Sequence, residues 1–133
     1  MPGSALFDFG DAIRSAANTA REDEPDISKV KFDISIFEAF ASGYLTHTEG
    51  LLTEAEANNF PEAAMLLTYI IGIRFLTDYL NGDIYYKTRY PEHNLVRARV
   101  QFQLIREMEE QYGSMQTVMK RIKTRLLLFN SQP

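Results

Sequence analysis

The chain has 133 residues, of which 45% are hydrophobic and 24% are charged, and this is typical of a single soluble domain. It contains no cysteine, which excludes a disulfide scaffold, a zinc–thiolate site and a cysteine nucleophile. A formal net charge of −4 argues against general nucleic-acid binding. The N-terminal residues lack the basic and apolar segments of a secretory signal, so we expect a cytoplasmic protein.

The first segment of the chain has the apolar spacing of a helix. Leu6, Phe9 and Ile13 recur at intervals of three and four residues, and they predict a helix over residues 5–20. The acidic stretch with a proline at residues 22–26 predicts a solvated loop after this helix.

Two further helices are predicted before the middle of the chain. Phe37 and Phe40 lie on one face of a helix predicted over residues 33–47, and Asp33 is positioned to cap its first turn. The sequence Thr53-Glu54-Ala55-Glu56 is a capping-box pattern that predicts a short helix.

The segment of residues 62–80 is apolar on almost every side. This pattern predicts a helix in the middle of a bundle, covered on all its faces. Arg74 and Asp78 interrupt the segment, which argues against a membrane-spanning helix and predicts no membrane partner. Gly82 is a natural left-handed residue with which such a helix ends.

The C-terminal third predicts an irregular stretch at residues 84–91 and then a long helix that Asn94 caps. Gly113 is the weak point of this helix, so residues 114–133 are a candidate for an additional helix. The apolar stripe of the whole segment consists of Leu95, Ala98, Phe102, Ile105, Met108, Tyr112, Met115, Met119, Ile122, Leu126 and Phe129. Five or six helices and no sheet are expected, which is an all-α helical bundle.

Several polar residues are candidates for chemistry, and each has a structural alternative. The tripeptide Asp8-Phe9-Gly10 matches a kinase magnesium motif, or else Asp8 and Asp11 brace the first helix. Arg74 either forms an ion pair with Asp78, one turn later, or binds the oxygen atoms of a ligand.

The remaining candidates are aromatic or basic. Tyr85, Tyr86 and Tyr90 either line a cleft or cover the bundle. His47 and His93 lack metal-ligand spacing, and we expect them at helix ends or on the surface. The basic C-terminal helix complements its own dipole or offers a surface to an acidic partner; its cations are Lys120, Arg121, Lys123 and Arg125.

Three strings of residues resemble one family. They are Ala5-Leu6-Phe7-Asp8-Phe9-Gly10-Asp11-Ala12-Ile13-Arg14, Gly72-Ile73-Arg74-Phe75-Leu76-Thr77-Asp78-Tyr79-Leu80-Asn81-Gly82-Asp83, and Tyr90-Pro91-Glu92-His93-Asn94-Leu95 with the downstream Arg97, Arg99, Gln101 and Phe102. They resemble the C-terminal part of the N-acetylhexosamine 1-kinases, in the aminoglycoside phosphotransferase and choline kinase-like superfamily. The resemblance spans roughly residues 1–112.

The resemblance implies a two-lobed, ATP-dependent sugar kinase whose helical C-terminal lobe holds the acceptor, so residues 1–133 would be one helical domain of a larger enzyme. In that family the magnesium-binding aspartate precedes a Met-Pro-Gly stretch like Met1-Pro2-Gly3. We therefore expect the nucleotide lobe, the catalytic loop and the metal ligand to be missing from this chain. ATP and Mg²⁺ would belong to the parent enzyme, and this chain would contain no cofactor, no catalytic residue and no metal ligand.

The same resemblance assigns roles to three residues. Arg74 and Tyr85 would face the acceptor sugar, an N-acetylhexosamine converted to its sugar 1-phosphate, and Asp8 would support the catalytic loop. An alternative is a non-catalytic helical interaction module that self-associates, chiefly through its last helix. A further alternative is a regulatory subunit that completes a separately encoded kinase lobe.

Overall fold

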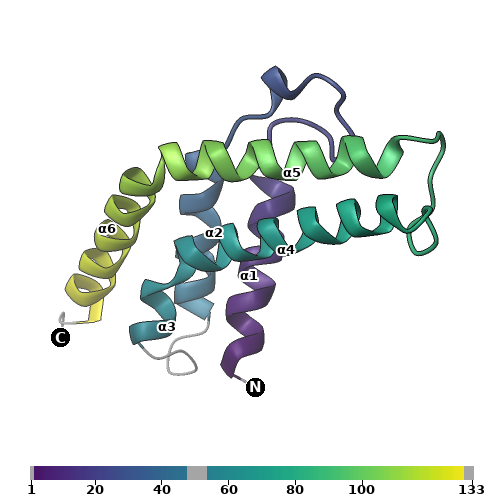
Figure 1. Cartoon of the computed structure of the whole chain (residues 1–133). Coiled ribbons are helices and arrows are strands. Elements are labelled where there is room, and N and C mark those ends of the chain that lie inside the picture. The colour runs from purple at the N-terminus through teal and green to yellow at the C-terminus, as the bar shows by residue number, and fades with distance from the viewer. Residues whose placement is uncertain (1, 48–53, 131–133) are drawn as a thin grey trace.

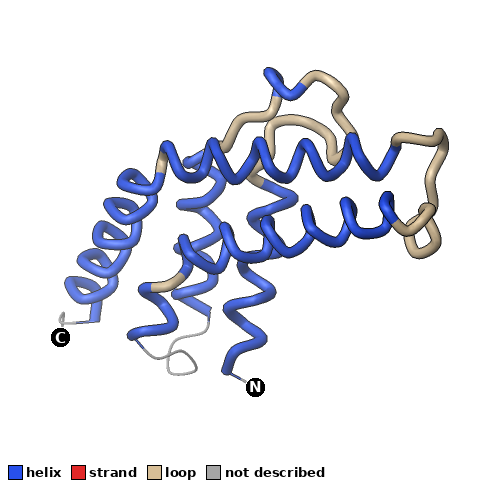
Figure 2. Tube along the Cα trace, in the orientation of Figure 1, coloured by secondary structure: helices blue, strands red, loops and turns tan. Residues whose placement is uncertain are grey.

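The computed structural model describes residues 2–47 and 54–130, and it confirms the all-α class. The helices are α1 (Pro2–Ala16), α2 (Ile34–His47), α3 (Glu54–Asn58), α4 (Phe60–Leu80), α5 (His93–Glu110) and α6 (Tyr112–Asn130), with a 3-10 turn, η1 (Ile27–Lys29). Loops join them, and the described residues contain no strand beyond one isolated bridge between Asn18 and Phe32 (Figure 2).

Two long helices, α4 and α5, run side by side in opposite directions and organise the fold (Figure 1). α1 packs across α4, and α6 turns away from the end of α5 to pack on α2. The crossing of α1 over α4 requires a residue without a side chain, because a Cβ at Gly10 would lie 2.6 Å from the backbone oxygen of Ala63.

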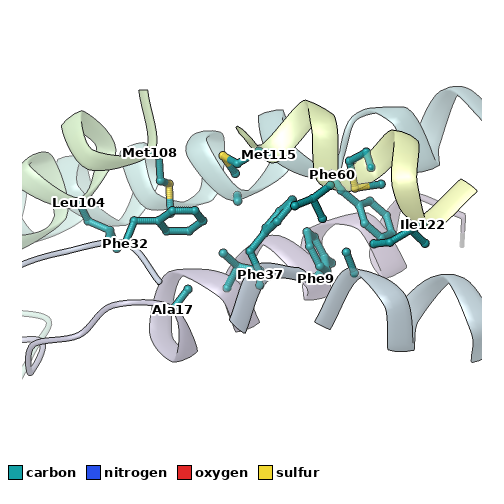
Figure 3. Packing of buried hydrophobic residues seen from close by; sticks show 14 of the residues in the cluster. Phe9, Ala17, Phe32, Phe37, Phe60, Leu104, Met108, Met115 and Ile122 are labelled. Carbon is teal, nitrogen blue, oxygen red and sulfur yellow. The ribbon is translucent and has the colours of Figure 1, made fainter. Parts of the chain in front are cut away.

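A cluster of aromatic rings forms the centre of the core where α1, α2 and α4 meet (Figure 3). The ring of Phe9 stacks on Phe60 with centroids 4.1 Å apart, and it meets Phe37 edge-on at 5.7 Å. Phe9 and Gly10 of the kinase-like tripeptide are therefore packing residues, while Asp8 is exposed on the other side of α1. Asp11 braces the first helix, as its structural alternative predicts, because it accepts a hydrogen bond from Arg14 at 3.1 Å.

The first helix lies earlier in the chain than the predicted 5–20, because it begins at Pro2 and ends at Ala16. The backbone beyond it pairs instead with the segment that leads into α2. Thr19 N–H donates to the Lys31 carbonyl at 3.0 Å, and Asp33 N–H donates to the Ala17 carbonyl at 2.8 Å. Hydrogen bonds to a distant segment therefore replace the last predicted turn, which local spacing could not indicate.

The predicted caps have mixed outcomes. Asp33 caps α2 as predicted, since its carboxylate accepts from the backbone N–H groups of Ser35 and Ile36. Asn94 does not cap α5, which begins one residue earlier at His93. Thr53, part of the predicted capping box, lies outside the described residues.

The predicted weak point of the last helix is a real break, but it lies at Gln111 rather than Gly113. From there α6 folds back, and it buries Met115, Met119 and Ile122 against the rest of the chain. This part of the stripe therefore packs on the rest of the chain, while Leu127, beyond it, is 71% exposed; self-association through the last helix stays a prediction. The side chain of Phe129 lies outside the described residues.

The prediction that α4 is covered on every side is wrong. α1 and α5 cover two sides of the helix, and the third side leaves Leu66, Tyr69 and Ile73 between 40% and 51% exposed. By length and composition α4 could span a membrane, with a mean hydropathy of 1.4 in a stretch of which 33% is buried. One such helix is weak evidence for a membrane protein, and the arrangement is consistent with a soluble protein.

Candidate functional site

A hollow of about 440 Å³ lies where the last turns of α4 meet the loop that leads to α5. In Figure 1 this is the end of the α4–α5 pair farthest from α6. Its lining residues are Ile73, Arg74, Thr77, Asp78, Asn81, Tyr85 and Tyr86. The hollow therefore brings together Arg74 and Tyr85, the two residues that the sequence predicted for the acceptor site.

Arg74 is exposed in this hollow, although the sequence placed it in a buried position. The predicted ion pair with Asp78 is not formed, and within the described residues Arg74 has no hydrogen-bond or ion-pair partner. The physical reason is that α4 leaves this side uncovered, so the guanidinium stays hydrated and needs no buried counter-charge. Its five N–H donors are available to a ligand.

Asp78, in contrast, is only 6% exposed and is fully engaged inside the protein. Its Oδ1 accepts the backbone N–H of Tyr85 at 2.8 Å, and its Oδ2 accepts that of Tyr86 at 3.0 Å. The side-chain amide of Asn94 donates to Oδ2 at 2.8 Å. The N–H of Tyr86, more than any other group, holds the pKa of Asp78 below 3.8, against the opposing effect of burial.

The turn between α4 and the tyrosines has two successive residues with left-handed backbone. Gly82 has φ 93° as predicted, and Asp83 follows with φ 60°, which is uncommon for a residue with a side chain. The Asn94 amide also donates to the Asp83 carboxylate at 2.9 Å and so connects the turn to α5. Arg97 completes the connection by donating to the Asn94 side-chain oxygen and to the Lys87 carbonyl, both at 3.0 Å.

The three tyrosines differ in whether they line a cleft or cover the bundle, the two roles that the sequence left open. Tyr85 lines the hollow and is 82% exposed, with its ring edge-on to Tyr86 at 4.9 Å. Tyr86 also lines the hollow while it packs on Phe75 at 4.8 Å. Tyr90 lies elsewhere and stacks on the ring of His93 at 4.5 Å.

His93 lies at a helix end, as expected, and it is buried there with only 2% of its surface exposed. Its Nδ1 accepts the backbone N–H of Arg89, so Nε2 carries the hydrogen and donates to Asp23 at 2.9 Å. This bond lowers the pKa of the Asp23 carboxyl. The acidic loop is therefore not merely solvated, because Asp23 attaches it to the start of α5 and Glu22 pairs with Arg14.

The other candidates lie away from the hollow. Asp8 is exposed on α1 and does not line it. Two of the four cations of α6, Arg121 and Arg125, pair with Glu38 of α2. A groove of about 490 Å³ between α1 and α2 is almost entirely apolar, and its described lining residues include no Asp, Glu, Lys or Arg. In the part of the chain that the structure describes, no three His, Asp or Glu side chains are grouped as metal ligands.

Comparison with known protein families yielded no family model that matches this chain. The resemblance to the sugar kinases therefore stays a prediction from the sequence.

The resemblance singles out Arg74 and Tyr85, which line one hollow, but it does not indicate the groups that organise this hollow. Residue spacing offers Asp78 as an ion-pair partner of Arg74 and Asn94 as a helix cap, and the structure shows neither role. One sequence feature does indicate that Asp78 organises the hollow: it is an acidic residue in an apolar helix, shortly before the Asn81-Gly82-Asp83 turn. Carboxylates near such turns accept backbone N–H groups a few residues later.

Proposed function

We propose that this chain is the acceptor-binding helical subdomain of an ATP-dependent sugar phosphotransferase that makes a sugar 1-phosphate from an N-acetylhexosamine. The observation that carries the proposal is that Arg74 and Tyr85 line the same hollow. ATP and Mg²⁺ would be held by other parts of the enzyme, and the chain would act in the cytoplasm without catalysing the reaction alone.

The chemistry of the hollow suits a neutral sugar with an acyl group. An unpaired guanidinium donates to carbonyl and hydroxyl oxygens, and an exposed tyrosine ring stacks on the apolar face of a pyranose. Thr77 and Asn81 add a hydroxyl and an amide to the same wall. The carboxylate of Asp78 is buried, so among the described lining residues the exposed charge is the guanidinium of Arg74, which would repel the ammonium of an unacylated amino sugar.

The proposal is tested by titrating the 133-residue chain with N-acetylglucosamine and N-acetylgalactosamine, followed by two-dimensional NMR. We expect saturable shifts around residues 73–86, and much weaker binding of glucosamine. Arg74→Ala should weaken binding by about 1.5–3 kcal/mol, or roughly tenfold to a hundredfold, through loss of a charged hydrogen bond. Tyr85→Ala should weaken it similarly.

Arg106→Ala is the matched control, since Arg106 is exposed on α5 and lies outside the lining of the hollow. It should bind the sugars as the unmodified chain does. Saturable binding of Mg-ATP by the chain alone would contradict the division of roles, and absence of sugar binding at tens of millimolar would refute the acceptor site.

A second candidate function is self-association, and one observation favours it. The side of α4 that neither α1 nor α5 covers presents Leu66, Tyr69, Ile73 and Leu80, each at least 40% exposed. A two-fold pairing would place this apolar face on its own copy and remove it from water. Light scattering coupled to size exclusion decides: a mass of 15.3 kDa at high micromolar concentration refutes it, and a doubled mass that Tyr69→Ser halves supports it.

A further inference from the structure

Tyr85 lines the hollow although almost no side-chain packing holds it there. Its side chain is 82% exposed, and its ring touches only the neighbouring ring of Tyr86 among the described aromatic contacts. An exposed ring on a loop is ordinarily mobile, because little packing restricts it. Whatever fixes Tyr85 beside Arg74 must therefore act on the backbone.

The backbone is held by one buried carboxylate. The two oxygens of Asp78 receive the N–H groups of Tyr85 and Tyr86, so both residues are attached to the last full turn of α4. The carbonyl of Asp78 accepts a further bond from Asp83 N–H at 2.8 Å, at the left-handed point of the turn. Asp78 thus holds the turn in two places: at Asp83, and at Tyr85 and Tyr86, which follow the turn.

The side chain of Asp78 holds the turn after α4 and is not needed to end the helix. α4 already ends at Leu80, with Asn81 N–H bonded to the carbonyls of Thr77 and Asp78. The side-chain oxygens of Asp78 take no part in those bonds; they accept from Asn94 and from the backbone N–H groups of Tyr85 and Tyr86, and the N–H of Ile84 also lowers the pKa of Asp78.

We propose that Asp78 is a positioning residue for the acceptor site: it holds the Tyr85–Tyr86 backbone so that Tyr85 forms a fixed wall beside Arg74. This inference rests on the proposed function, because the wall has a purpose only if a ligand enters the hollow. Asp78 itself does not act on the ligand, since it is buried and both of its carboxylate oxygens accept donors from within the protein.

The test is Asp78→Asn in the full 133-residue chain. The amide keeps one acceptor oxygen, so its NH₂ group must face either Tyr85 N–H or both Tyr86 N–H and the Asn94 amide, and at least one donor loses its acceptor. We expect the amide hydrogens of Tyr85 and Tyr86 to lose their exchange protection while those of the α1–α2 core keep theirs. N-acetylglucosamine should bind about tenfold more weakly, because binding must then supply the free energy of ordering the turn.

Asp83→Asn is the matched control, since it removes one charge from the same network and keeps the oxygen that accepts from Asn94. It should leave the Tyr85 and Tyr86 amides and the sugar affinity nearly unchanged. If Asp78→Asn does not fold, Asn94→Ala tests the same point, because it releases Oδ2 of Asp78 and should loosen the Tyr86 amide first.

The outcomes separate the two proposals. If the unmodified chain binds the sugar and Asp78→Asn binds it equally well, the positioning role is overturned and the acceptor site stands. If the amides remain protected in Asp78→Asn, the positioning role is likewise overturned. If the unmodified chain binds no N-acetylhexosamine, the proposed function fails, and the ligand role of Asp78 fails with it.

Discussion

The two ends of α4 are held in different ways. Its N-terminal half contributes Phe60 to a cluster of stacked aromatic rings, where shape and apolar burial provide the stability. Its C-terminal end is held by hydrogen bonds, with Asp78 and Asn94 at the centre of a polar network. Apolar packing leaves little side-chain surface for a ligand, whereas the polar end leaves Arg74 and Tyr85 exposed beside a hollow.

The largest effect is expected at the aromatic end. Phe9→Ala should cost about 3–5 kcal/mol of unfolding free energy, because it removes a fully buried ring that contacts Phe60, Phe37 and Tyr44. Urea unfolding followed by circular dichroism measures the loss. Phe7→Ala is the control, since Phe7 is 51% exposed on the same helix and should change stability by no more than about 0.5 kcal/mol. Equal losses in the two variants would contradict the packing described for α1.

A smaller effect is expected where α1 crosses α4. Gly10→Ala places a Cβ against the backbone of Ala63, which cannot rotate away, so the helices must separate at a cost of about 1–3 kcal/mol. Gly43→Ala on α2 meets no atom within 4 Å, and it should stabilise the chain by up to about 1 kcal/mol through helix propensity. Thermal melts of both variants show whether their effects have opposite signs.

We expect the contact between the acidic loop and α5 to contribute about as much to the free energy of unfolding as the crossing of α1 and α4, or somewhat less. His93→Ala removes a buried ring and leaves Arg89 N–H and the Asp23 carboxylate without their partner, which costs about 1–3 kcal/mol. The pKa of Asp23 should return toward its usual value, because its principal hydrogen bond is lost. His47→Ala, at an exposed position, is the control. An unchanged Asp23 titration by NMR would show that this hydrogen bond does not form in solution.

As the pH is lowered, the polar C-terminal end of α4 should lose stability at a higher pH than the aromatic N-terminal end. The pKa values of Asp78 and Asp23 are lowered in the folded chain, so these carboxylates add stability at pH values above about 3.8, their usual value. That contribution disappears as the pH falls through their folded pKa values. Hydrogen exchange below pH 4 should therefore show the Tyr85 and Tyr86 amides opening at a higher pH than the amides around Phe9. Simultaneous opening would mean that the two ends are not energetically distinct.

The sequence by itself determined the helices and much of the core. Apolar spacing identified α2, α4 and the α5–α6 stripe, and local chemistry identified the Asp33 cap and the left-handed Gly82. These features depend on interactions within a few residues, which is why a pattern along the chain suffices to predict them. The resemblance to the sugar kinases selected Arg74 and Tyr85, and the structure then brought them to one hollow.

Only the tertiary structure decided which faces are covered and which polar groups meet. An apolar helix has no pattern that says which side its neighbours will cover, so the exposed face of α4 could not be anticipated, and residue spacing could not decide whether Arg74 pairs with Asp78 or stays free. Asn94 joins a carboxylate 16 residues earlier, and His93 joins an aspartate 70 residues earlier. Such pairings form because burial leaves no water to satisfy these groups, and burial is a property of the packed fold rather than of any local segment.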